Sequence, residues 1–287
     1  MKKRIVVFGA TGRIGRELLT LLSKAGIATV AVTRDDTKAT SAPNILWKVA
    51  DMNVKESLTN VMQKDDVVFL LSNVGQNFIE QQYNVASVGK QLGIAHIVKL
   101  SSGAADAQSK LLIPRAHGLA EDFIIASGLS YTILRSNGMM QNWLGEVAES
   151  VRNNRLFHES TRNGRRAYVD IRDIAEVAFH VLTEPGRHAN KTYLLTGDVA
   201  VNYDDVADTI ANVIHEAVRY IPVGLEEART QMIAQGMPMP LVETFLEYDR
   251  DQAEGRAEFV TTHVRDILNK PARSLHDFVT DYRQHFI

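Results

Sequence analysis

The stretch IVVFGATGRIGREL, residues 5–18, decides the fold. A short apolar run, Ile5–Phe8, leads into a turn with Gly9, Gly12 and Gly15, and a helical pattern follows. The spacing is G-x-x-G-x-x-G rather than G-x-G-x-x-G. Glycines between a strand and a helix let the backbone approach a pyrophosphate, which the helix N-terminus attracts. The stretch therefore predicts a dinucleotide-binding turn, although a sharp turn that needs glycine for its shape alone is the alternative.

The same alternation of strand and helix continues beyond this turn. Apolar, β-branched runs predict strands at 4–9, 28–33, 67–71, 96–102 and 130–135, and KTYLLTG, residues 191–197, predicts a last strand of the sheet. Amphipathic patterns predict helices at 13–26, 55–63, 78–92 and 115–127. Nearly continuous apolar strands that alternate with helices are typical of a parallel sheet covered on both faces. The expected fold class is α/β, a Rossmann-type doubly wound parallel sheet.

The alternation changes after Arg135. The stretch TRNGRRAYV, residues 161–169, has an Asn-Gly turn between two short extended runs and predicts a hairpin. From about residue 200 onward the helical patterns are more polar and are interrupted by prolines. The expected domains are an NADP-binding Rossmann domain at 1–136, to which 168–199 returns, and a smaller, mostly helical substrate domain at 137–287, mainly 137–167 and 200–287.

Composition excludes several classes of function. The chain has 287 residues, 45% of them apolar, and a net charge of −2, so it lacks the basic excess that nucleic-acid binding requires. It contains no cysteine, and its nine histidines lack metal-binding spacing, so no disulfide and no metal site are expected. No apolar run approaches the about 18 residues of a membrane span, and a soluble, cytoplasmic protein is expected.

The end of the second predicted strand distinguishes between cofactors. NAD-binding proteins place a carboxylate here to bind the ribose hydroxyls. This chain has Arg34, nineteen residues after Gly15, and Arg13 in the glycine turn is a second cation. Two guanidinium groups suit a 2′-phosphate, so NADP(H) is expected to be preferred over NAD(H). The alternative is that Asp35 or Asp36 binds the ribose hydroxyls.

Four stretches together resemble the atypical short-chain dehydrogenases/reductases, and more narrowly the NmrA-like group. They are GATGRIG at 9–15, TRD at 33–35, SGLSYTILRSNGMMQN at 127–142 and YVDIRDIAEVAFHVLTEP at 168–185. The group includes triphenylmethane-dye reductases, NAD(P)H-dependent quinone reductases and redox-sensing regulators. The resemblance covers nearly the whole chain and is strongest in the first 200 residues.

This resemblance implies a set of nucleotide contacts at the ends of the predicted strands. They are Gly9, Thr11, Gly12, Arg13, Ile14 and Gly15 at the phosphates, Arg34 at the 2′-phosphate, Asp51 and Met52 at the adenine, Leu71, Ser72 and Asn73 at the ribose, and Ser101 and Ser102 near the nicotinamide.

The chain departs from the superfamily at the proton donor. Active short-chain dehydrogenases carry Tyr-x-x-x-Lys, whereas IPRAHGLAEDF, residues 113–123, places His117 and Glu121 at that spacing. Histidine has a suitable pKa range for proton donation, which makes His117 the catalytic candidate. The alternative is a helix residue that orders the cofactor or a loop. Glu121 is expected to orient the ring or to be solvated, and Ser136 replaces the proline of the family's usual LRP.

The expected function follows from these features. Electrophilic substrates do not need a Tyr-Lys pair, so we expect hydride transfer from NADPH to a small molecule such as a quinone or a dye. A non-catalytic NADP(H)-sensing regulator that acts through a protein partner is the alternative. A monomer or homodimer is expected. An apolar cluster could form one wall of a substrate pocket or could be core: Met139, Met140, Trp143 and Leu144.

Overall fold

The computed structural model describes residues 3–287, and the chain divides into two compact units. The first unit contains Met1–Ser136 and Ile174–Leu194, and the second contains Asn137–Asp173 and Leu195–Ile287. Residues 168–173 and 195–199, which the sequence places with the first domain, belong to the second unit.

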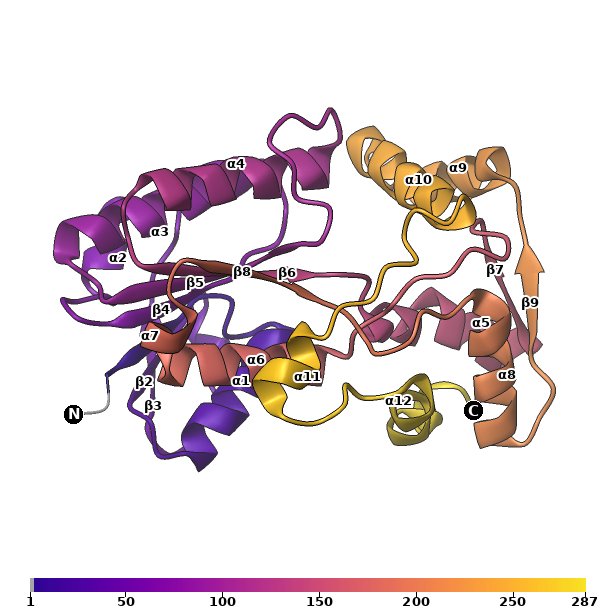
Figure 1. Ribbon diagram of the computed structural model, residues 1–287, viewed down its shortest axis with the longest axis horizontal. Helices are drawn as coiled ribbons and strands as arrows, with labels where there is room; N and C mark the ends of the chain where they lie inside the picture. The colour runs from indigo at the N-terminus through magenta and orange to yellow at the C-terminus, as the bar shows by residue number, and fades with distance from the viewer. Residues whose placement is uncertain (1–2) are drawn as a thin grey trace. The chain divides into compact units, whose positions relative to one another are not determined.

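A seven-stranded sheet forms the centre of the first unit (Figure 1). Its order is β3-β2-β1-β4-β5-β6-β8, and every pair from β3 to β6 is parallel. The strands are β1 (Ile5–Val7), β2 (Thr29–Thr33), β3 (Ile45–Val49), β4 (Val67–Leu70), β5 (His96–Ser102), β6 (Tyr131–Ser136) and β8 (Lys191–Leu195). Residues of β1 and β4 are at most 1% exposed, as expected for central strands covered on both faces.

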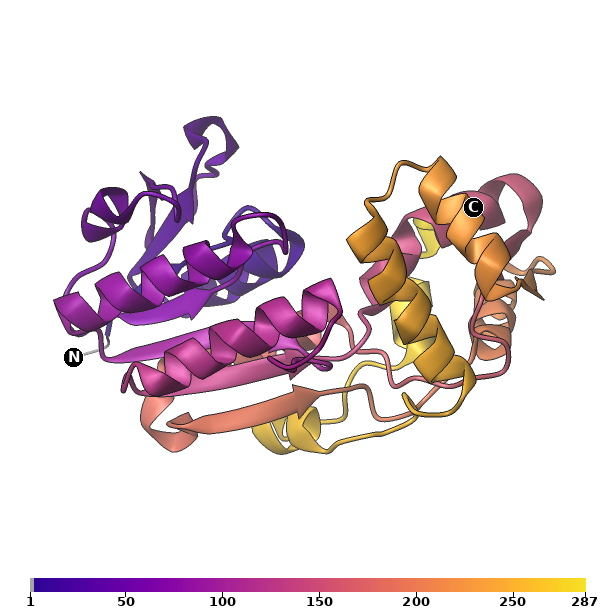
Figure 2. The ribbon, with the colours of Figure 1, turned by 90° about the horizontal axis from the view of Figure 1, so that it is seen from above.

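Helices cover both faces of this sheet. They are α1 (Arg13–Lys24), α2 (Lys55–Thr59), α3 (Phe78–Leu92), α4 (Leu112–Ala126), α6 (Ile171–Thr183) and α7 (Pro185–His188), with a 3₁₀ turn η1 (Asp36–Lys38). Figures 1 and 2 show α3 and α4 side by side on one face, and Figure 1 shows α1 and α6 on the other. The predicted α/β, doubly wound Rossmann-type fold is confirmed. Among residues 3–287, no helix has the length and apolar character needed to cross a membrane.

The strand order locates the edge at which such a sheet binds ligands. The chain proceeds outward from β1 to β2 and β3, then returns to place β4 on the other side of β1. The order therefore reverses between β1 and β4, and open α/β sheets bind ligands at the carboxyl ends of strands at such a reversal. The glycine turn follows β1 at this point.

The second unit is mostly helical. Its two strands, β7 (Leu156–Glu159) and β9 (Arg219–Pro222), pair in parallel. Its helices are η2 (Met140–Leu144), α5 (Glu146–Asn154), α8 (Tyr203–Ile214), α9 (Leu225–Ala234), α10 (Met239–Ala253), α11 (His263–Leu268), α12 (Leu275–Asp281) and η3 (Arg283–His285). The largest apolar cluster of this unit is rich in aromatic rings, including Trp143, Phe157, Tyr203, Tyr220 and Phe278.

The hairpin predicted at 161–169 is wrong. A turn does form, because Gly164 N–H donates to the Thr161 carbonyl at 3.0 Å. The flanking residues, however, pair elsewhere: β7 pairs with β9, and Arg166 forms an antiparallel bridge with Val201. A turn signal sets the direction of the chain only locally, and the choice of strand partner depends on distant segments.

Candidate functional site

Two of the three glycines in the turn are required by the fold itself. Gly9 has a φ of +76°, and a Cβ there would lie 2.7 Å from the Leu71 carbonyl oxygen. A Cβ on Gly15 would overlap the backbone of Gly9 and Ala10. Any larger side chain at Gly9 or Gly15 would therefore disturb the turn between β1 and α1.

Gly12 is different, because its surroundings are open. It is exposed, and an added Cβ would have only the Gly9 carbonyl oxygen near it, at 3.3 Å. Gly12 is also the N-cap of α1, where no side chain of the described residues forms a capping hydrogen bond. The first turn of α1 contains no acidic residue. Its N–H groups and the helix dipole thus favour an anion, and the turn fits the pyrophosphate of a dinucleotide.

The second charged position lies directly after β2. Arg34 is exposed there, and so is Arg13 at the start of α1. The competing carboxylate of Asp35 accepts hydrogen bonds from Thr37 Oγ1 at 2.6 Å and from Thr37 N at 3.1 Å. These bonds lower the pKa of Asp35 and occupy its Oδ1, while its Oδ2 lies 3.8 Å from Lys38 Nζ. Asp36 begins η1 and is exposed.

The predicted adenine residues follow β3. Asp51 Oδ1 accepts hydrogen bonds from Asn53 N at 2.9 Å and from Asn53 Nδ2 at 2.8 Å. The Met52 carbonyl accepts a hydrogen bond from Asn84 Nδ2 of α3 at 2.9 Å. The carboxylate of Asp51 therefore stabilises the turn between β3 and α2, and a helix side chain holds the backbone of Met52 in place.

The remaining predicted nucleotide residues follow β4 and end β5. Leu71 lies beside Gly9, and Ser72 Oγ accepts a hydrogen bond from Gln82 Nε2 at 2.9 Å. Ser101 and Ser102 are the last two residues of β5. Because β1 to β5 are parallel, all the predicted nucleotide residues lie at one edge of the sheet, including Asn73 and Ile14. The side chain of Ile14 is buried, so the turn presents the backbone of this residue. Their contacts with a nucleotide remain a prediction.

His117, on α4, has a partner from another element of the first unit, the β5 residue Lys99. Its Nδ1 lies 3.1 Å from Nζ of Lys99, a β5 residue that is 0% exposed. The imidazole is half-buried and packs edge-on against Phe78, with ring centroids 4.8 Å apart. Ser101 Oγ is a second neighbour of Nδ1, at 3.4 Å. The imidazole thus belongs to a polar cluster rather than to an open helix surface.

Burial changes the charge of both partners. Burial, together with the nearby charge of Lys99, lowers the pKa of His117 to about 3. Burial also lowers the pKa of Lys99 to about 7, with Glu121 opposing this effect and Arg135 adding to it. His117 is therefore neutral at neutral pH, because its pKa lies below the range that is ordinary for histidine. Lys99, in contrast, titrates near neutrality.

Glu121 is buried, so of the two alternatives the solvated carboxylate is wrong. It is 3% exposed, and Arg135 Nη2 lies 2.5 Å from its Oε2. Arg135 Nε is 3.1 Å from both carboxylate oxygens, and Ser101 Oγ donates to Oε1. Glu121 thus binds the ends of β5 and β6, and its link to His117 passes through Ser101 and Lys99 rather than through a direct i, i+4 pair.

One signal in the sequence could have identified this cluster. Lys99 interrupts the otherwise apolar run IVKL, residues 97–100, of a predicted buried strand. Lysine is almost never fully buried unless it is paired, so a lysine at that place predicts a buried partner. The identity of the partner was not predictable, because His117 comes from another element.

The proposed apolar pocket wall is mainly core. Met140 and Trp143 are 4% and 2% exposed in the largest apolar cluster of the second unit, and Trp143 packs on Tyr168 with ring centroids 4.6 Å apart. Leu144 packs against the same cluster. Met140 also lines a cavity of about 420 Å³ within the second unit, so it serves both packing and a cavity wall.

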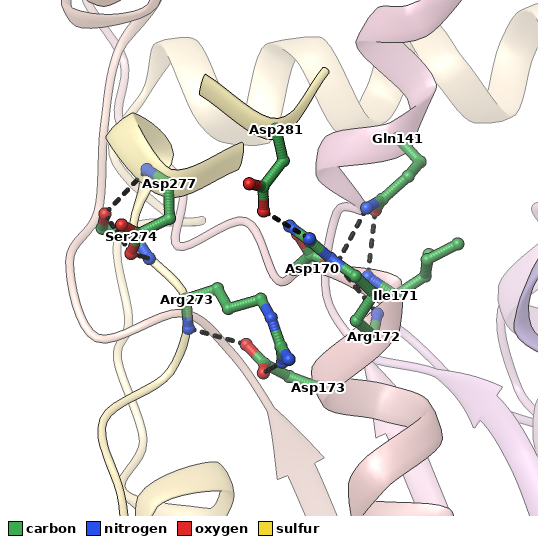
Figure 3. A network of polar contacts seen from close by, with 9 residues as sticks. All are labelled: Gln141, Asp170, Ile171, Arg172, Asp173, Arg273, Ser274, Asp277 and Asp281. Atoms are coloured by element: carbon green, nitrogen blue, oxygen red, sulfur yellow. Dashed lines mark hydrogen bonds and ion pairs between the residues drawn. The ribbon is translucent and has the colours of Figure 1, made fainter. Parts of the chain in front are cut away.

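A buried ion-pair network surrounds the start of α6 (Figure 3). Asp170 is 0% exposed, and its Oδ1 accepts hydrogen bonds from Gln141 Nε2 at 2.8 Å and from Arg172 N at 2.8 Å. Arg172 Nη2 lies 2.6 Å from Asp170 Oδ2, and Arg172 Nη1 lies 2.5 Å from Asp281 of α12. The motif YVDIRDIAEV thus joins segments of the second unit that are far apart in sequence.

Asp173 extends this network to another part of the second unit. Its Oδ2 accepts a hydrogen bond from Arg273 N at 2.7 Å, and the Arg273 guanidinium pairs with Oδ1 (Figure 3). The neighbouring Ser274 and Asp277 form the capping box of α12. Arginines and backbone groups thus bind these carboxylates. Within residues 3–287, no group of three or more His, Cys, Asp or Glu side chains is arranged to hold a metal ion.

Comparison with known proteins agrees with this fold. An NAD(P)H azoreductase of Xenophilus azovorans is 28% identical over 284 residues, covering 98% of this chain and 99% of its own. The structure of Escherichia coli NADPH-dependent quinone oxidoreductase with NADPH matches with a TM-score of 0.86 and 26% identity, covering 97% of this chain and 99% of its own.

A third match shares the fold at lower identity. The structure of Citrobacter sp. triphenylmethane reductase with NADP(H) has a TM-score of 0.85 and 24% identity, covering 96% of this chain and 99% of its own. The NmrA-like family matches residues 1–274. Together with the doubly wound sheet and its glycine turn, this match shows that the chain belongs to the NmrA-like family.

Proposed function

We propose that this protein is an NAD(P)H-dependent oxidoreductase that transfers hydride from NADPH to an electrophilic small molecule such as a quinone or a dye. The observation that carries the proposal is the open N-terminus of α1, where Gly12 is exposed and no acidic residue occupies the first turn. The relatives support it, because two of them are named as NAD(P)H-dependent reductases of azo compounds and quinones.

The cofactor preference rests on the charges at the end of β2. Arg34 and Arg13 would bind the 2′-phosphate of NADP(H), while Asp35 already binds Thr37. The first turn of α1 would hold the pyrophosphate, and the residues after β3, β4 and β5 would hold adenine, ribose and nicotinamide. When bound, the reduced nicotinamide supplies the hydride. The protein contributes binding, orientation and a site for the proton.

His117 is the proposed catalytic side chain. The sequence contains no Tyr-x-x-x-Lys, so this chain must manage without the proton donor of the wider superfamily. A neutral imidazole can donate a hydrogen bond or a proton from one ring nitrogen. Electrophilic acceptors need only modest help of this kind, because their reduced forms also take protons from water.

The second unit is the proposed substrate domain. Its cavity of about 420 Å³ has a mostly apolar lining that includes Met140, Tyr168 and Val201. Small-molecule sites typically measure about 300–1,000 Å³ and are lined by apolar and aromatic side chains. We propose a monomer or homodimer that binds its acceptor with this unit. Hydrogen exchange with a bound quinone should protect amides near Met140, and protection confined to the first 135 residues would contradict the assignment.

The decisive experiment measures oxidation of NADPH with a panel of quinones and cationic dyes. The protein should turn over at least one of them, and Gly12→Val should abolish both NADPH binding and turnover. The variant should stay folded, since a Cβ at this exposed position meets only the Gly9 carbonyl oxygen, and circular dichroism checks this. Tight NADPH binding without turnover across the panel would instead identify a nucleotide-sensing regulator.

A further inference from the structure

Lys99 has no role in the function proposed above, yet its position is unusual. It is 0% exposed on β5, and its Nζ lies 3.1 Å from His117 Nδ1 and 3.2 Å from the Leu100 carbonyl oxygen. A fully buried lysine costs free energy unless its hydrogen bonds and charge are compensated. This site therefore has a buried amine held directly behind the proposed catalytic imidazole.

We propose that Lys99 is a positioning residue that holds His117 in the Nε2–H tautomer and returns a proton to Nδ1 when His117 protonates the reduced substrate. The inference rests on the proposed function, which supplies the substrate. Lys99 is thereby a source for the proton, a role that neither the family resemblance nor the proposed role of His117 assigns to it.

The tautomer follows from the donors around Nδ1. An ammonium group can only donate, so Nδ1 must accept from Lys99 while Lys99 is charged. Ser101 Oγ, the other neighbour of Nδ1, has one proton and donates it to Glu121. The ring proton of neutral His117 is therefore on Nε2. Among residues 3–287, Nε2 has no hydrogen-bond partner, so no protein group competes for its proton.

The proton step balances with the hydride step. Two-electron reduction of a quinone by hydride oxidises NADPH to NADP⁺ and leaves the hydroquinone one proton short. The Nε2–H bond of His117 breaks as the O–H bond of the product forms, and an Nζ–H bond of Lys99 breaks as Nδ1–H forms. After the product leaves, solvent protonates Nε2, the Nδ1 proton returns to Nζ, and both groups regain their initial states.

The charged groups around Lys99 place its titration in a useful range. His117 and Glu121 face it from α4, and Arg135 faces it from β6, while the Phe78 ring of α3 lies 5.4 Å from Nζ. Burial lowers the pKa of Lys99 to about 7, against the attraction of Glu121 and with the repulsion of Arg135. Lys99 can therefore both give up and regain a proton near neutral pH.

The first test observes the tautomer without turnover. Nitrogen-15 spectra of the histidine rings, recorded on the full chain with NADP⁺ at pH 6, should show His117 protonated at Nε2 and bare at Nδ1. His117→Gln assigns the signal among the nine histidines. In Lys99→Met, the ring should become a mixture of tautomers. A ring protonated at Nδ1 in the unmodified protein would overturn the inference, even if the variant fails to fold.

The second test uses the pH profile of kcat with a benzoquinone at saturating NADPH. The unmodified protein should lose activity as the pH rises through about 7, because Lys99 loses its proton. Lys99→Met should lower kcat about tenfold at pH 6 and remove this limb, since solvent must then supply the proton. Lys48→Met removes an amine from edge strand β3 of the same sheet and should keep the full profile.

The outcomes separate the two proposals. A Lys99→Met variant that turns over with an unchanged alkaline limb overturns the role of Lys99, while the oxidoreductase function stands. Failure of the unmodified protein to reduce any acceptor contradicts the proposed function instead. In that case the nitrogen-15 spectra test the positioning role of Lys99 by themselves, and the Nε2–H tautomer of His117 would support it.

Discussion

Among the buried carboxylates that bind arginines, Asp170 in the second unit and Glu121 in the first have different neighbours. Asp170, in the second unit, binds Arg172, Gln141 and the backbone at the start of α6. Glu121, in the first unit, binds Arg135 and Ser101, but a buried lysine and a neutral imidazole lie beside it. Both sites keep a charge away from water.

The difference between these sites separates structure from chemistry. Around Asp170, the side-chain partners are guanidinium and amide groups that do not titrate near neutral pH, so these contacts join distant segments but do not supply a proton. Around Glu121, burial lowers the pKa values of Lys99 and His117. Shifted pKa values beside a ligand-binding edge of a sheet indicate a functional site.

The largest expected effect is on the structural network. Asp170→Asn removes the charge that compensates the mostly buried Arg172, and breaking such a pair costs about 3–5 kcal/mol. Urea unfolding followed by tryptophan fluorescence should show this loss. Asp281→Asn, which removes the half-exposed partner of the same arginine, should cost about 1 kcal/mol or less. Equal losses in the two variants would contradict the structural role of Asp170.

An acid-induced loss of stability should come next and should involve the first unit. Burial lowers the pKa of His96 to about 4, and its ring bonds Ser130 and Thr132 at 2.8 Å each. Below pH 6.5, the ordinary pKa of histidine, the unfolded chain binds a proton at this residue that the folded protein does not bind until about pH 4. The contribution of His96 to the free energy of unfolding therefore falls by about 3 kcal/mol as the pH drops from about 6.5 toward 4.

Unfolding measured at pH 7, 5 and 4 checks this prediction. His96→Gln should show a shallower loss between pH 7 and 4 than the unmodified protein. The exposed His158 provides the matched control, and His158→Gln should leave the pH dependence unchanged. A His96→Gln variant that is as sensitive to acid as the unmodified protein would assign the loss to other groups.

Cofactor preference should change by an intermediate amount. Arg34→Glu replaces a charge-assisted contact, worth about 1.5–3 kcal/mol, with repulsion, so NADPH should bind about ten- to a hundredfold or more weakly. NADH binding should change far less. Calorimetric titration of both cofactors measures the ratio. Equal affinity of the unmodified protein for NADPH and NADH would refute the preference.

The smallest expected effect is on turnover through His117. His117→Ala should lower kcat by about tenfold with NADPH affinity intact, since the acceptor is electrophilic and water can supply a proton. A loss of about a thousandfold would mean that the imidazole is an indispensable acid. Unchanged NADPH binding and unchanged turnover would mean that residues 113–123 form an ordinary helix with no catalytic role. The contrast between the sites of Glu121 and Asp170 would then disappear.

Local patterns in the sequence were enough to predict the fold and the edge that carries the predicted nucleotide residues. The spacing of Gly9, Gly12 and Gly15 between a strand and a helix, and the repeated alternation after it, depend on neighbours along the chain. The edge strand β3, Ile45–Val49, was not among the predicted strands, because its partly exposed residues do not form a continuous apolar run.

Only the tertiary structure decided which polar side chains meet. Lys99 and His117 are eighteen residues apart, and Glu121 and Arg135 fourteen, on different elements of the first unit. Sequence spacing suggested a His117–Glu121 pair on one helix face, but packing directs Glu121 to Arg135 instead. Burial then sets the pKa values of His117 and Lys99. Both effects depend on segments that folding brings together and on the water it removes, which no local pattern encodes.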